Sequence, residues 1–212
     1  MAEIVRLTES SDWIDLGFVQ RERTPKPLME LGIRLHVAGL SLSNTISELE
    51  KFGVQRTRKA VHDWVHKADL QPNADRSTPN HVALDETVIR IDGEQFWLYN
   101  AVDPATNEIL HARLYPARTT ALTEQFLGEL REKHDVDDAL FLVDRGPWLH
   151  AALQRHGLRF RHETHGNRNH VERVYTEVKR RTSSFSNTFS HVDPVTAENW
   201  LQTHATWWNS LN

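Results

Sequence analysis

The sequence contains no cysteine among its 212 residues. Disulfide bonds, iron–sulfur clusters, cysteine-based zinc fingers and thiol catalysis are therefore excluded. The longest uninterrupted apolar run is Ala139–Val143, far short of the roughly 20 residues that a membrane-spanning helix needs. No apolar stretch of the signal-peptide type follows Met1, so we expect a cytoplasmic protein with no membrane partner.

Charge is distributed unevenly along a chain whose net charge is only −4. Residues 81–154 carry a net charge of −7, whereas residues 155–181 carry +5. A second basic stretch, Lys51–Ala68, contains Asp63 as its only acidic residue. Such asymmetry indicates a polyanion bound at the basic stretches and cations held at the acidic one, although solvated helix faces would give the same pattern.

The N-terminal third is predicted to be helical. Residues 1–26 lack a persistent period and are interpreted as an N-terminal arm. Residues 27–70 hold three short helical patterns separated by Gly39 and Gly53, an arrangement typical of a helix-turn-helix module that binds DNA. The third helix has an apolar stripe for packing and a polar face that could enter a major groove. That polar face carries Arg58, Lys59, His62, His66 and Lys67.

A second module is predicted after a proline-containing linker at residues 71–80. Within residues 81–212 the pattern indicates strands at 81–92, 94–103, 108–116, 139–143 and 158–162, and helices at 120–134, 147–156, 167–185 and 194–211. Asp92-Gly93 is typical of a hairpin turn between the first two strands. The order predicts an α/β fold, with a mixed sheet and helices on both faces.

Three carboxylates occupy positions that suggest chemistry. Asp85 lies within the first strand, where an unpaired buried charge would be costly. Asp144 follows a fully apolar strand, where open α/β sheets place their sites, although it could instead cap the next helix. Glu172 lies in the basic helix and could equally be a solvated surface residue. Together the three could hold two divalent cations through oxygen ligands, as phosphoryl transfer requires.

These residues carry a family resemblance. The segments Leu84-Asp-Glu-Thr, Val143-Asp-Arg-Gly-Pro-Trp and Arg161-His-Glu-Thr-His-Gly-Asn-Arg-Asn-His-Val-Glu-Arg, in this order, resemble the DDE transposases of insertion sequences, and most closely the insertion-sequence-six family and its archaeal relatives. The resemblance implies a ribonuclease-H-like catalytic domain at residues 81–212. It further implies that Asp85, Asp144 and Glu172 form the catalytic triad and bind two Mg²⁺ or Mn²⁺ ions, with Lys179 as an additional catalytic residue that contacts DNA.

The resemblance also implies the partner. The expected partner is double-stranded DNA, both the terminal inverted repeats of the element and its target, and the expected working unit is a homodimer or higher oligomer on the nucleoid. Basic residues of the long helix would bind phosphates in any sequence. These are Arg168, Arg173, Arg180 and Arg181.

Several alternatives stay open from sequence alone. Glu86, expected on the opposite face from Asp85, and Glu163 could replace one of the named carboxylates. His162, His165 and His170 match no defensible zinc spacing. Asp144 and Glu172 lie closer together than in the usual pattern of the family, so the chain could be an inactive or truncated copy that acts as a DNA-binding regulator. A metal-dependent nuclease without strand transfer is the third possibility.

Overall fold

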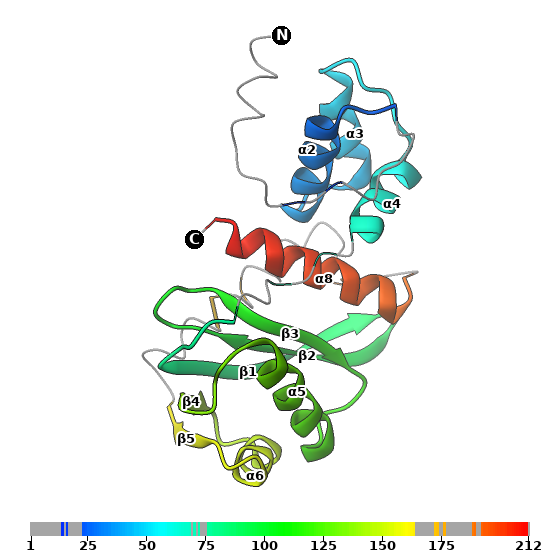
Figure 1. The fold of residues 1–212 in the computed structure, drawn as a ribbon. Coiled ribbons are helices and arrows are strands. Elements are labelled where there is room, and N and C mark those ends of the chain that lie inside the picture. Colours follow the sequence, from blue (N-terminus) through cyan, green and yellow to red (C-terminus); the bar gives the residue numbers. More distant parts are fainter. Residues whose placement is uncertain are drawn as a thin grey trace.

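The computed structural model describes residues 14, 16, 23–68, 70, 72, 76–163, 172–173, 176, 188–189 and 192–211 (Figure 1). The helices are α2 (Lys26–Val37), α3 (Leu42–Glu50), α4 (Arg58–Ala68), α5 (Thr120–Lys133), α6 (Pro147–Arg155) and α8 (Pro194–Asn209). The strands are β1 (His81–Ile91), β2 (Glu94–Val102), β3 (Ile109–Tyr115), β4 (Leu140–Val143), β5 (Arg159–His162) and β6 (Thr188–Phe189). Of the long helix expected at 167–185, the described residues 172, 173 and 176 are helical.

One mixed sheet organises the fold. Its order is β3-β2-β1-β4-β5; β1, β2 and β3 are antiparallel neighbours, whereas β4 runs parallel to β1 and β5 runs parallel to β4. The hairpin between β1 and β2 turns at Asp92 and Gly93, whose φ angles of 48° and 88° are those that an Asp-Gly turn favours. This topology confirms the predicted ribonuclease-H-like mixed sheet flanked by helices. The short β6, which the sequence pattern did not indicate, pairs in parallel with the end of β1.

Helices cover both faces of the sheet (Figure 1). On one face, Val82 and Leu84 of β1 pack in the same hydrophobic core as residues of α5 and α6. On the other face, Ala83 and Ile89 of β1 share a core with Trp200 of α8. Successive side chains of a strand point to opposite faces, so β1 contributes alternately to both layers. The same alternation places Asp85 on the α8 side of the sheet and the next residue on the α5 and α6 side.

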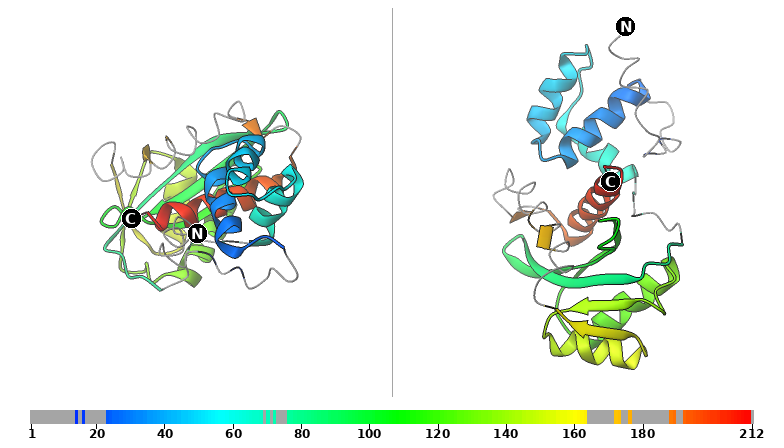
Figure 2. Two further views of the ribbon diagram at one scale, coloured as in Figure 1. Left: turned by 90° about the horizontal axis from the view of Figure 1, so that it is seen from above. Right: turned by 90° about the vertical axis from the view of Figure 1, so that its left-hand side faces the viewer.

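Of the three N-terminal helices, α2 and α4 pack on α8, on the side away from the sheet, and α3 packs on α2 and α4 (Figure 2). Ser41 caps α3 by accepting a hydrogen bond from Asn44 N at 3.2 Å. Gly32 lets the helices approach closely, because a Cβ there would lie 3.2 Å from side-chain atoms of Leu49 and Trp64. Their apolar residues belong to the same core as α8, so α8 connects the helical layer to the sheet through continuous apolar packing.

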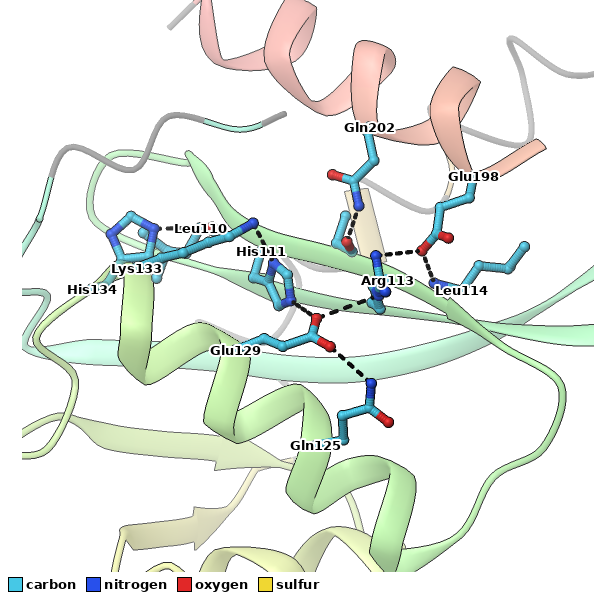
Figure 3. A network of polar contacts seen from close by, with 11 residues as sticks. Leu110, His111, Arg113, Leu114, Gln125, Glu129, Lys133, His134, Glu198 and Gln202 are labelled. Atoms are coloured by element: carbon cyan, nitrogen blue, oxygen red, sulfur yellow. Dashed lines mark hydrogen bonds and ion pairs between the residues drawn. The ribbon is translucent and has the colours of Figure 1, made fainter. Parts of the chain in front are cut away.

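The outer edge of β3 is covered by side chains (Figure 3). Glu198 of α8 accepts a hydrogen bond from Leu114 N at 3.2 Å, and Gln202 donates one to Ala112 O. Asn209 bonds both Ile109 N and Ile109 O, at 2.8 and 2.9 Å. An edge strand whose backbone groups are already bonded cannot pair with a further strand at those positions.

Polar side chains around the buried ring of His111 connect α5 to β3 and α8 (Figure 3). Glu129 Oε2 lies 3.0 Å from His111 Nε2 and 3.4 Å from Arg113 Nε, and Arg113 also contacts Glu198 at 3.3 Å. Burial lowers the pKa of His111, which therefore donates Nε2–H to Glu129 as a neutral ring. Its other nitrogen then accepts from Lys133 Nζ at 3.3 Å.

Candidate active site

The two predicted aspartates lie near the middle of β1 and directly after β4, its parallel neighbour. In the β1–β4 ladder Ala83 pairs with Leu142. Asp85 lies two residues further along β1, and Asp144 is the first residue after the end of β4. Adjacent strands are about 4.8 Å apart, so this pairing brings the two residues close together. Asp85 is 7% exposed, and one of its oxygens, Oδ1, accepts a hydrogen bond from Glu86 N at 3.0 Å.

Local backbone contacts hold Asp144 in its loop. Its Oδ1 accepts a hydrogen bond from Gly146 N at 2.7 Å, and its carbonyl oxygen lies 2.7 Å from His150 Nε2. The N-cap of α6 is Gly146, which has no side-chain cap. Asp144 therefore orders the loop before the helix rather than occupying the N-cap position that the sequence left open.

Gly146 brings this loop close to an indole ring. A Cβ at Gly146 would lie 3.0 Å from Asp144 Oδ1 and 3.0 Å from two ring carbons of Trp148. A side chain at this position would therefore force the carboxylate or the indole to shift.

A third carboxylate, that of Glu86, interacts electrostatically with both aspartates. Its side chain is only 3% exposed, and its Oε1 lies 3.6 Å from Arg118 Nη1. Burial, together with the negative charges of Asp85 and Asp144, raises the pKa of Glu86 to about 7 against the opposing effect of Arg118. Carboxylates this close repel one another, and a divalent cation bound by their oxygens would relieve that repulsion. Asp85 and Asp144 therefore suit a hard cation as oxygen donors.

Arg118 was not found by sequence reasoning. Its guanidinium carbon lies 4.1 Å from the ring centroid of Trp97 and 4.2 Å from that of Trp148. The three residues come from β2, from the loop between β3 and α5, and from α6. No local pattern signals such a stack, because its members are close only in the folded chain.

Glu172, the third member of the predicted triad, is exposed on a helix instead of lying in the sheet. Glu172 and Arg173 are helical and exposed, and Glu172 O accepts a hydrogen bond from Thr176 Oγ1 at 2.8 Å. Within the described part of the chain, no three histidine, aspartate or glutamate side chains form a group that could hold a metal ion. The structure therefore brings Asp85 and Asp144 together without adding Glu172 to a three-ligand group.

Of the other predicted site residues, the structure describes Glu163 but not several basic residues and histidines that follow it. Glu163 aligns with Asp144 through the β4–β5 ladder, donating its N–H to Val143 O at 3.0 Å, and its carboxylate pairs with Arg161 at 2.6 Å. The residues that lie outside the described part of the chain are His165, Arg168, His170, Lys179, Arg180 and Arg181.

The polar face of α4 is partly free and partly packed. Arg58, Lys59 and Lys67 are exposed, with Lys59 Nζ 3.1 Å from Asp63. The rings of His62 and His66 are half-buried, 4.2 Å apart between centroids. Burial and the neighbouring His62 lower the pKa of His66, whereas Asp193, the N-cap of α8, raises it. The last turn of α4 is therefore near the start of α8.

Comparison with known proteins finds a matching family model and several similar chains. A family model described as a DDE domain matches residues 80–206, a range that contains Asp85, Asp144 and Glu172. An uncharacterized protein of Methanocaldococcus jannaschii is 28% identical over 198 residues, which is 92% of each chain. Among solved structures, the catalytic core domain of BIV integrase has 16% identity and a TM-score of 0.43, covering 59% of this chain and 80% of that one. The catalytic core domain of HTLV-2 integrase in complex with magnesium has 14% identity and a TM-score of 0.39, covering 55% and 73%.

No helix in the described ranges is both long enough and apolar enough to cross a membrane.

Proposed function

This chain belongs to the DDE transposase family, and we propose that it binds the terminal inverted repeats of an insertion sequence and catalyses metal-dependent DNA cleavage and strand transfer. The observation that carries the proposal is the parallel pairing of β1 with β4, which brings Asp85 on β1 and Asp144 directly after β4 close together. Paired carboxylates at this edge of a sheet are the ligand type that Mg²⁺ prefers.

The roles proposed for the residues follow from their chemistry. Asp85, Asp144 and Glu172 would hold two Mg²⁺ or Mn²⁺ ions, with Glu172 brought in from its helix. Such ions activate a water or DNA 3′-hydroxyl and stabilise the leaving oxygen. Asp144 is oriented for this by its hydrogen bond from Gly146 N. Lys179 would contact the DNA near the cleaved bond.

Binding of double-stranded DNA is proposed to involve two basic surfaces. In the N-terminal unit, residues 27–70, which follow an arm at 1–26 and precede a linker at 71–80, the exposed Arg58, Lys59 and Lys67 would contact DNA together with His62 and His66. In the catalytic unit, residues 81–212, Arg168, Arg173, Arg180 and Arg181 would bind phosphates. The two DNA ends of the insertion sequence must be held together, so the working unit would be a dimer or higher oligomer. It would act in the cytoplasm on the nucleoid.

The direct test supplies inverted-repeat DNA, a target plasmid and Mg²⁺ or Mn²⁺. We expect strand-transfer products from the wild type and a loss of at least about 10³-fold in Asp85→Ala, Asp144→Ala and Glu172→Ala, as removal of an ion ligand implies. Asp135→Ala, an exposed aspartate with no proposed role, is the matched control. Cleaved ends without joined products would favour the nuclease, and binding without cleavage would favour the regulator. Strand transfer that survives Asp144→Ala would remove the assignment.

The proposed DNA-binding face has a separate test. Replacing Arg58, Lys59 and Lys67 with glutamine should weaken binding at low salt. It should also reduce the slope of log affinity against log salt by about 2 to 3, because each phosphate contact contributes roughly 0.9. An unchanged slope would place the DNA elsewhere.

A further inference from the structure

Arg118 contacts both β1, the strand that carries Asp85, and α6, the helix that follows the Asp144 loop. Its guanidinium lies between the rings of Trp97 and Trp148, 4.1 and 4.2 Å from their centroids. Its Nη1 also lies 3.6 Å from the carboxylate of Glu86, the residue next to Asp85 on β1. One side chain therefore contacts β1, β2 and the start of α6 at once.

Trp148, which Arg118 contacts, is in turn linked to Asp144 through Gly146. Gly146 lies between the two, since an added Cβ would be 3.0 Å from both the indole and Asp144 Oδ1. The Gly146 N–H is also the donor that holds Asp144 Oδ1, at 2.7 Å. Movement of the Trp148 ring would therefore shift the backbone that orients the carboxylate.

We propose that Arg118 is a positioning residue, which clamps Trp148 and thereby fixes the Asp144 loop against β1. The role of this clamp in catalysis rests on the proposed function, whereas its effect on the loop does not. Arginine suits the task because its planar guanidinium stacks on aromatic faces, whereas the compact ammonium of lysine does not. Its charge also offsets that of Glu86, which is buried beside the aspartates.

The decisive variant is Arg118→Lys, which keeps the charge and removes the planar stack. The control is Arg131→Lys: the Arg131 side chain is 37% exposed, close to the 39% of Arg118, and it pairs with the carboxylate of Asp137. The first measurement is the amide resonance of Gly146, which reports its hydrogen bond to Asp144 in the full chain without metal or DNA. In Arg118→Lys we expect a shifted resonance and hydrogen exchange about tenfold faster, as local opening becomes easier.

The second measurement is the Mn²⁺ concentration that gives half-maximal DNA cleavage. We expect about a tenfold rise in Arg118→Lys, because a loosened Asp144 binds metal less well, with DNA affinity and its salt dependence unchanged. If Arg118→Lys fails to fold, Trp97→Phe, which weakens the same stack, takes its place. A wild type that does not cleave DNA would remove the proposed function, while the Gly146 amide would still decide on the clamp.

Two outcomes would overturn the proposal. One is a Gly146 amide in Arg118→Lys that exchanges as in the wild type and in Arg131→Lys. The other is a reduced salt slope of DNA binding with an unchanged Gly146 amide, which would make Arg118 a phosphate contact.

Discussion

Glu129 offers a test of how a charge stabilises this fold, because its carboxylate joins α5 to β3 (Figure 3). Hydrogen bonds from His111 Nε2 and Gln125 Nε2, each at 3.0 Å, and the charge of Arg113 lower the pKa of Glu129 to about 2. The hydrogen bond from His111 is the largest of these effects, and burial opposes them. In the unfolded chain the pKa returns to its ordinary value of about 4.5.

The magnitude follows from this difference. Each pKa unit corresponds to about 1.4 kcal/mol, so the shift would contribute about 3 kcal/mol at neutral pH, or about 2 kcal/mol after allowance for solvent screening. A carboxylate with a lowered pKa stabilises the fold fully above its unfolded pKa, and this contribution is lost as the pH falls through the folded one. The stabilisation should therefore be complete above about pH 5.5 and decline between about pH 4.5 and 2.

The variant is Glu129→Gln, which keeps the shape and removes the charge. Urea denaturation at pH 7 should give a free energy of unfolding about 2 kcal/mol lower than that of the wild type, and the difference should roughly halve at pH 3. Glu132→Gln, an exposed glutamate on the same helix, should change stability by less than about 0.5 kcal/mol. A deficit in Glu129→Gln that is equally large at pH 3 and pH 7 would refute the argument, because it would not arise from ionisation.

Two further predictions follow from close contacts. Gly146→Ala should lower DNA cleavage at least about tenfold in the proposed assay, because the methyl group would displace Asp144. Gly128→Ala is the comparison, because its methyl group would meet no atom within 4 Å. It should stabilise α5 by about 0.5 to 1 kcal/mol in thermal unfolding. Equal cleavage by both variants would contradict the tight loop. Asn209→Ala should lower the free energy of unfolding by about 1 to 3 kcal/mol, because it removes the hydrogen bonds to both backbone groups of Ile109 at the sheet edge. Light scattering should then detect more self-association than in the wild type, because the edge strand is left open to pairing. A variant as stable and monodisperse as the wild type would show that this edge needs no cover.

The sequence by itself determined the elements of the sheet closely, because their signals are local. The apolar run at 139–143 became β4 (Leu140–Val143), and Asp92-Gly93 turns the first hairpin with the expected positive φ angles. Alternation along β1 likewise placed Asp85 and Glu86 on opposite faces. Each of these signals is contained in a few neighbouring residues and does not depend on distant parts of the chain.

Only the tertiary structure decided how those elements combine. The pairing of β1 with β4, which brings Asp85 and the Asp144 loop together, joins strands separated in the chain by β2, β3 and α5. The long crossover between two parallel strands does not by itself fix their register. β6 is two residues long, too short to show a period, and forms only because β1 offers it unpaired backbone. The Arg118 stack and the covered edge of β3 likewise depend on residues brought together by packing. Such contacts are set by the relative placement of whole elements, which no local pattern encodes.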